Sequence, residues 1–170
     1  MERNFIDGYT EWQTNPEIVA VNKLPQHATL MPYENFDEAK KADRYASTRC
    51  KLLNGKWKFK LYKNYAYRPS DFAQPHYDSH NWDSVIVPCS WQMQGYDQAQ
   101  YCNVRYPWEG SEDICPPNAP TKHNPVGCYL KRIHINEAVL SKRVVLCFEG
   151  VESAFYLYVN GERVGYSEST

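Results

Sequence analysis

Apolar and polar residues alternate in residues 56–61, KWKFKL, where three lysines separate a tryptophan, a phenylalanine and a leucine. Alternation with a period of two places one side of the segment in a core and the other in water, which is typical of a half-exposed antiparallel strand. Asn54-Gly55, directly before this segment, is a turn signal. The pattern therefore predicts a strand that begins after the turn.

Short apolar runs elsewhere predict further strands. We expect them at residues 85–87, 128–135, 143–149, 155–159 and 162–166. Pro88 should end the first of these runs, and Asn160-Gly161 should join the last two as a hairpin. None of the runs alternates with a long amphipathic helix, so a parallel α/β sheet is disfavoured. Short strands with long connections favour an all-β, antiparallel sandwich.

The amino-terminal part has a different character. Residues 1–33 contain Pro16, Pro25 and Pro32 among scattered apolar residues, which predicts an extended arm. Asn35 and Glu38 have the spacing of a capping box and predict one short surface helix that runs to about residue 46. We therefore divide the chain into residues 1–46, an arm and helix that pack on the domain or on a neighbouring subunit, and residues 47–170, the sandwich.

Charge and composition exclude several classes of function. The 170 residues include 19 basic and 20 acidic side chains, a net charge of −1, so no basic surface indicates nucleic acid or an anionic membrane as a partner. No apolar run is long enough to span a membrane, and the first residues lack a signal-peptide core, so we expect a cytoplasmic protein. The six cysteines form no C-x-x-C pair. This disfavours a zinc site, and we expect free, buried thiols.

After the expected strand and Pro88, residues 89–110 are too irregular for a helix or a strand, yet they are rich in aromatic residues. Disordered segments are poor in aromatic side chains, so we expect an ordered surface loop with a function. Aromatic rings offer flat faces to the C–H groups of sugars, and amide side chains can pair with sugar hydroxyls. The alternative is that the rings pack at one end of the sandwich, and composition alone favours that alternative.

Several sequence motifs resemble those of a known family. They are PCSWQMQGYD at residues 88–97, QYCNVRYPWEG at 100–110, NPVGCY at 124–129 and FYLYVNGERVGYSES at 155–169. In this order they resemble the amino-terminal, sugar-binding domain of family 2 glycoside hydrolases, and most closely that of the large β-galactosidases. The resemblance implies a jelly-roll sandwich. It also implies that the chain is a carboxy-terminally truncated fragment of a larger enzyme, which hydrolyses terminal non-reducing β-D-galactose residues by a retaining mechanism.

The resemblance assigns roles to two residues. Asn103 matches an asparagine that hydrogen-bonds a galactose hydroxyl, and Val104 matches a residue that lines the sugar pocket. The family's two catalytic glutamates lie on a barrel further along the parent polypeptide, so no catalytic residue is assigned here. Glu109, Glu112 and Asp113 are acidic, but loop acids beside prolines are usually solvated. We expect this chain alone to be inactive.

Metals and partners also follow from the resemblance. The parent is expected to use Mg²⁺, with Na⁺ as an additional candidate, at sites mainly outside this chain. Asn15 and Glu168 are the nearest matches to an outlying magnesium site of the family, but the spacing before Asn15 differs, so no metal is assigned. The expected partners are a β-galactoside, the parent's catalytic barrel and neighbouring subunits of a homo- or hetero-oligomer. The alternatives are an autonomous carbohydrate-binding module, or the corresponding domain of a β-glucuronidase or β-mannosidase.

Overall fold

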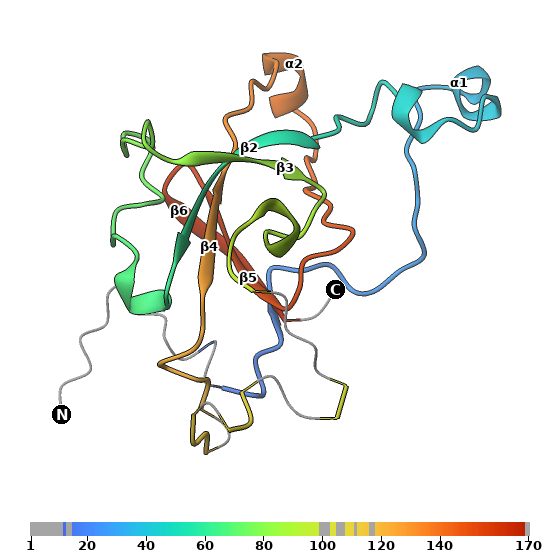
Figure 1. Cartoon of the computed structure of the whole chain (residues 1–170). Coiled ribbons are helices and arrows are strands. Elements are labelled where there is room, and N and C mark those ends of the chain that lie inside the picture. The colour runs from blue at the N-terminus through green and yellow to red at the C-terminus, as the bar shows by residue number, and fades with distance from the viewer. Residues whose placement is uncertain are drawn as a thin grey trace.

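The structure is a computed structural model that describes Trp12 and residues 15–98, 103–104, 108–110, 112–115 and 118–168. Strands dominate the described residues (Figure 1), which confirms the all-β prediction. The strands are β1 (Ala20–Val21), β2 (Gly55–Tyr62), β3 (Asp83–Val87), β4 (Val126–Leu130), β5 (Ala154–Val159) and β6 (Glu162–Glu168). In this part of the chain they form two antiparallel sheets, with strand orders β1-β6-β5 and β3-β2-β4.

Helical segments are short. They are α1 (Phe36–Lys40), α2 (Glu137–Leu140) and the 3-10 turns η2 (Arg44–Ala46), η3 (Tyr65–Tyr67) and η4 (Gln92–Gln94). No helix among the described residues is long and apolar enough to cross a membrane.

The central strand β2 forms where the alternating pattern predicts it, directly after the Asn54-Gly55 turn. Its Phe59 is fully buried, with 0% of its surface exposed. On one side β2 pairs with β3, with Trp57 opposite Val85, and β3 ends at Val87, just before the expected break at Pro88. The sequence therefore located both strands correctly.

Strand β4 is shorter than expected, because it ends at Leu130 rather than at residue 135. Leu130 pairs with Lys58 of β2, and the ladder stops there. The ammonium group of Lys131 donates to the carbonyl oxygen of Lys56 at 2.9 Å, so a side chain takes the acceptor that a longer strand would use.

The β5–β6 hairpin turns at Asn160-Gly161, as the sequence predicts. Both residues have positive φ, 53° for Asn160 and 94° for Gly161. A two-residue turn of this kind matches the right-handed twist of its strands, and asparagine followed by glycine adopts it at little cost.

The strand expected at residues 143–149 is absent, and this prediction is wrong. The segment is irregular, and its apolar side chains are exposed, with Val145 exposed by 55%. The neighbouring strand β5 pairs only with β6 among the described strands. An apolar run can become a strand only where another strand supplies partners for its N–H and C=O groups, and no described strand does so here.

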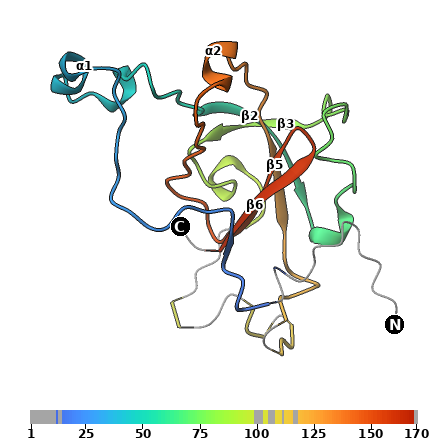
Figure 2. The same cartoon turned by 180° about the vertical axis from the view of Figure 1, so that it is seen from behind.

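The arm contributes a strand that the sequence did not predict. Ala20 lies opposite Ser167, and Val21 lies opposite Tyr166, so β1 adds an edge to the second sheet. Figures 1 and 2 show from opposite sides that α1 stands apart from both sheets at the end of the arm. Contact of α1 with another subunit stays a prediction.

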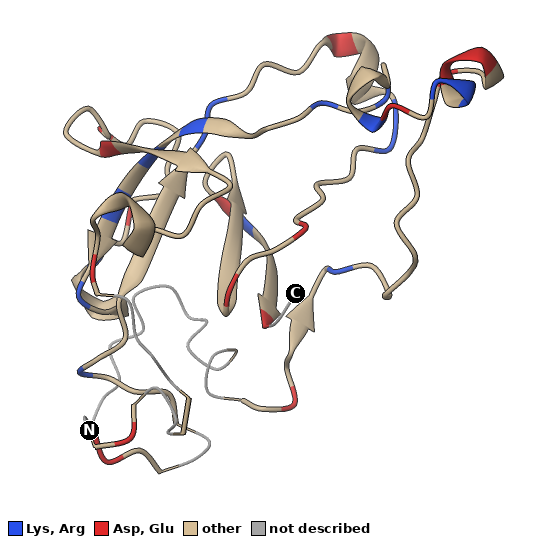
Figure 3. Ribbon diagram, turned by 45° about the vertical axis from the view of Figure 1, so that its right-hand side comes forward, with Lys and Arg blue, Asp and Glu red and all other residues tan. Residues whose placement is uncertain are grey.

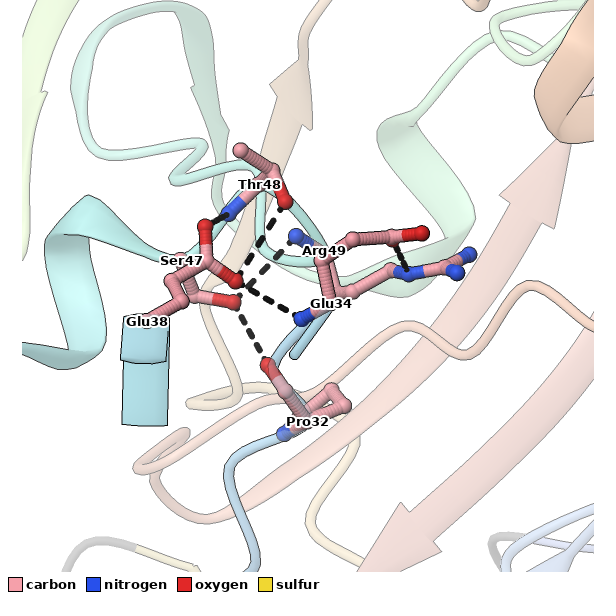
Figure 4. Close-up of polar contacts among 6 residues, drawn as sticks. All are labelled: Pro32, Glu34, Glu38, Ser47, Thr48 and Arg49. Atoms are coloured by element: carbon pink, nitrogen blue, oxygen red, sulfur yellow. Dashed lines mark hydrogen bonds and ion pairs between the residues drawn. The ribbon is translucent and has the colours of Figure 1, made fainter. Parts of the chain in front are cut away.

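Asn35 caps α1 as the sequence predicts, because its Oδ1 accepts the N–H of Glu38 at 2.9 Å. The Glu38 carboxylate in turn accepts the N–H of Glu34 at 2.7 Å, one residue before the usual capping-box donor, and the N–H of Thr48 at 3.0 Å (Figure 4). The helix ends at Lys40 rather than near residue 46. Ala42 has a φ of 53°, a left-handed conformation that an α-helix cannot contain.

Aromatic side chains join the two sheets. The Tyr65 ring, just after β2, lies 6.2 Å from the Tyr156 ring of β5, centroid to centroid. Phe72 meets Tyr158 of β5 edge-on at 5.2 Å. Between them the buried Arg68 guanidinium lies over the rings of Tyr65 and Phe72, at 4.2 Å and 4.7 Å. This layer fixes the sheet that carries the candidate loop against the hairpin.

Candidate functional site

Asn103 and Val104 lie in a bend on the surface of the protein. Both are exposed, and Val104 has 88% of its surface accessible. Tyr101 and Cys102 of the same sequence word lie outside the described residues. The sugar-contacting role of Asn103 and Val104 stays a prediction.

The aromatic residues that open the loop pack inward. Trp91 and Tyr96 contact Phe59 of β2, with ring centroids 6.0 Å and 4.8 Å away. Burial, and then a hydrogen bond to Asp83, raise the pKa of Tyr96, so its hydroxyl stays protonated. For these two rings the structure favours the packing alternative over sugar stacking.

The amide of Gln94 fixes the start of the loop to β3. Its Oε1 accepts the Ile86 N–H at 2.7 Å, and its Nε2 donates to the Ile86 carbonyl oxygen at 3.1 Å. One side chain thus satisfies both backbone groups of a residue on the edge strand, as a neighbouring strand would. We call this pair of hydrogen bonds the Gln94 anchor.

The Glu112 carboxylate fixes the segment that follows the loop. Oε1 accepts the N–H and the hydroxyl of Thr121, both at 2.9 Å. Oε2 accepts the N–H of Lys122 at 2.9 Å and that of His123 at 3.3 Å. We call these four hydrogen bonds the Glu112 anchor.

The same hydrogen bonds, with that from the Thr121 N–H foremost, lower the pKa of Glu112 from 4.5 to about 2, against the opposing effect of burial. The lowered pKa means that the anchor is fully formed above pH 4.5 and is lost only as the pH falls through about 2. At neutral pH Glu112 is therefore ionised and has no proton to give as a general acid.

Asn15 and Glu168, the nearest matches to the family's outlying magnesium site, each accept a hydrogen bond within the chain. The Asn15 Oδ1 accepts the N–H of Glu17 at 3.0 Å, and the Glu168 carboxylate accepts the Tyr166 hydroxyl. Glu168 lines a hollow of about 530 Å³ that also contains Lys23, whose positive charge opposes a metal cation. No cluster of three or more His, Cys, Asp or Glu suitable for a metal occurs among the described residues.

The described cysteines are free, as expected, but most of them are not buried. Five cysteines are described, and all are free. Only Cys128 of these five is buried, and burial raises its pKa to about 12. Cys89, Cys115 and Cys147 are exposed, so the prediction of buried thiols is wrong for them. Cys147 is exposed because its expected strand did not form.

Charges of both signs are interspersed along the described chain (Figure 3). Strand β2 carries lysines without acidic residues, while the chain as a whole has a net charge of −1.

Sequence reasoning missed Gln94 and the structural role of Glu112. Glu112 was considered only as a catalytic acid and set aside. Its donors lie 9, 10 and 11 residues further along the chain. Three of the four donors are backbone N–H groups, which are present at almost any position, so no motif marks them.

Comparison with known proteins gives a consistent picture. Residues 50–170 match the domain described as "Glycosyl hydrolases family 2, sugar binding domain". The chain is 47% identical over 164 residues to a protein named beta-galactosidase from Priestia megaterium, and 40% identical over 160 residues to one from Clostridium acetobutylicum. It is also 40% identical over 171 residues to a beta-galactosidase large subunit from Lactobacillus helveticus.

These similarities cover nearly all of this chain but a small part of each relative. The match to the Priestia megaterium protein covers 96% of this chain and 16% of that protein. The match to the Clostridium acetobutylicum protein covers 94% of this chain and 18% of that protein. The match to the Lactobacillus helveticus subunit covers 94% of this chain and 27% of that subunit.

Proposed function

This chain belongs to family 2 of the glycosyl hydrolases through their sugar-binding domain, and on that premise we propose that it is the amino-terminal domain of a β-galactosidase. The parent hydrolyses terminal non-reducing β-D-galactose residues with retention of configuration. This domain supplies Asn103 and Val104 to the galactose subsite and contains neither catalytic glutamate.

The observation that carries the proposal is similarity at 40–47% identity, over more than nine-tenths of the chain, to proteins that are named beta-galactosidases. The exposed bend at Asn103 adds physical support. A carboxamide can donate and accept at once, as a sugar hydroxyl does. Exposed Val104 offers an apolar surface beside it.

Asn103→Ala in the full-length enzyme should lower kcat/KM for a galactoside by at least about three- to tenfold. The estimate corresponds to one neutral hydrogen bond, worth about 0.5–1.5 kcal/mol. A larger loss is expected if the hydrogen bond strengthens in the transition state. Steady-state kinetics with a chromogenic galactoside and with its monodeoxy analogues measures the effect. The loss should shrink for the one analogue that lacks the contacted hydroxyl.

Asn118→Ala is the matched control, since Asn118 is an exposed asparagine in the segment after the Glu112 anchor residue, and its amide donates to the Cys115 carbonyl oxygen at 3.0 Å. It should leave kcat/KM unchanged. If Asn103→Ala enzyme melts normally and has wild-type kinetics with every analogue, Asn103 is a structural residue and the assignment is wrong.

The 170-residue chain alone should not hydrolyse a chromogenic β-galactoside above the buffer rate. A retaining glycosidase needs two carboxyl groups about 5 Å apart, one of them able to donate a proton. Glu112 cannot be that acid, because four donors hold it ionised. Activity that survives repurification and disappears with Glu109→Gln would contradict this.

The remaining parts of the proposal concern the parent. We expect Mg²⁺ at sites mainly outside this chain, a cytoplasmic location, and contacts with the catalytic barrel and neighbouring subunits. The relative from Lactobacillus helveticus is named a large subunit, so a hetero-oligomeric parent is one form of this proposal.

A further inference from the structure

The bend that carries Asn103 and Val104 lies between two fixed points. Before it the Gln94 anchor joins the chain to β3, and after it the Glu112 anchor joins the chain to residues 121–123. A loop that must place one amide against a sugar needs its ends held, because a displacement of about 1 Å can cost a hundredfold in rate.

The Glu112 anchor lies closer to the bend. Trp108 is the first described residue after Val104 and follows it by four positions, so the two lie at most about 14 Å apart along the chain. Before the bend the nearest residue that the structure shows held is Tyr96, which packs on Phe59 and precedes Asn103 by seven positions, a span of up to about 24 Å. Trp108 therefore restricts the sugar-contacting pair more tightly than the held residues before the bend.

Trp108 itself is held by the Glu112 anchor on two sides. Its carbonyl oxygen accepts the Glu112 N–H at 3.3 Å. Its indole Nε1–H donates to the carbonyl oxygen of His123 at 2.9 Å. His123 also gives its N–H to the Glu112 carboxylate, so both neighbours of Trp108 belong to the anchor.

The anchor is connected to the rigid part of the fold. The Thr121 carbonyl oxygen accepts the side-chain amide of Asn64 at 3.0 Å, and Asn64 caps η3 directly after β2. Residues 121–123 run into β4, which starts at Val126 and pairs with β2. A path of hydrogen bonds thus leads from the central sheet through Thr121 and Glu112 to Trp108.

A carboxylate is required for this arrangement. All four groups that face Glu112 are donors, and an ionised carboxylate only accepts. A glutamine in its place would turn two N–H donors toward the same backbone N–H groups and leave some of them without an acceptor.

We propose that Glu112 is a positioning residue, which holds Asn103 and Val104 in place for the sugar while touching neither sugar nor reacting atoms. The inference rests on the proposed function, because it presupposes that Asn103 contacts the substrate. It extends that function to a residue whose acidity serves neither catalysis nor metal binding.

The test is a double-mutant cycle in the full-length enzyme. Glu112→Gln should lower kcat/KM for a galactoside by roughly tenfold, and Asn103→Ala by at least about threefold. If Glu112 acts through Asn103, adding Glu112→Gln to the Asn103→Ala enzyme should cost less than about threefold more. Glu112→Asp, which keeps the charge on a shorter side chain, should recover part of the activity.

Asp113→Asn is the matched control. Asp113 is an exposed carboxylate next to Glu112, and this variant should keep wild-type kinetics. Thr121→Val is the second variant in case Glu112→Gln enzyme does not assemble. It removes one of the four hydrogen bonds and keeps the backbone, and it should lower kcat/KM about two- to threefold, again less in the Asn103→Ala background.

The outcomes separate the two proposals. If Asn103→Ala is neutral, the proposed sugar contact is wrong and the role of Glu112 falls with it. If Asn103→Ala impairs the enzyme but Glu112→Gln, or Thr121→Val in its place, leaves kcat/KM unchanged, only the positioning role is overturned. Fully additive losses would overturn it as well, because Glu112 would then act independently of Asn103.

Discussion

Replacing Phe59 with alanine should lower the free energy of unfolding of this chain by about 3–5 kcal/mol. Phe59 is fully buried at the centre of β2, where it contacts Trp91, Tyr96 and Tyr129. The loss combines the transfer of the ring from water with the cavity left behind, and these aromatic pairs add about 0.5–1.5 kcal/mol each. Domains have about 5–15 kcal/mol in total, so this change removes a large share.

Urea denaturation of the wild-type chain and the variant measures the effect. Phe36→Ala is the matched control, because Phe36 in α1 is 75% exposed and its loss should cost no more than about 0.5 kcal/mol. Equal losses for Phe36→Ala and Phe59→Ala would show that the described core is wrong. Trp91 and Tyr96 of the candidate loop pack on Phe59. In the Phe59→Ala variant this part of the loop should therefore become more mobile at urea concentrations below those that unfold the domain.

Gly127→Ala should destabilise the chain by about 1–3 kcal/mol, although alanine normally favours a strand over glycine. A Cβ built at Gly127 would lie 2.6 Å from Trp91 and 2.8 Å from Phe59. Phe59 is fully buried and Trp91 is half-buried against it, so moving either ring aside disturbs their packing. Glycine-to-alanine changes without strain stabilise by about 0.4–1 kcal/mol, which is smaller than the cost of this overlap.

Gly150→Ala is the opposite case in the same chain. Nothing lies within 4 Å of a Cβ at Gly150, and its φ is not positive, so the change should be neutral or slightly stabilising. The midpoints of urea denaturation of both variants, compared with that of the wild-type chain, measure these changes in stability. A Gly127→Ala chain at least as stable as wild type would mean that Trp91 does not press against β4, and the packing of the loop's start would need revision.

The two variants bear on function because Phe59 and Gly127 hold Trp91. The candidate loop begins at Trp91 and ends at the Glu112 anchor, so its first part depends on apolar packing and its last part on hydrogen bonds. Core variants should therefore disturb the sugar contact through stability, and Glu112 variants through position.

Local patterns in the sequence determined much of the fold. The KWKFKL alternation fixed β2 because a period of two can bury only one face, and Asn160-Gly161 fixed the hairpin because both residues tolerate positive φ. Asn35 likewise fixed the start of α1, since a cap needs only residues three positions apart. Each of these signals lies within a few residues, where chain geometry leaves few choices.

Tertiary structure decided the rest. Residues 143–149 have the composition of a strand but lack a described neighbour to pair with, while the arm gains β1 only because the edge of β6 is open to it. For the site, the sequence indicated Asn103 and Val104 but not what holds them. Glu112 became an anchor through backbone N–H groups that every residue except proline carries, and only the folded chain brings the right ones to it.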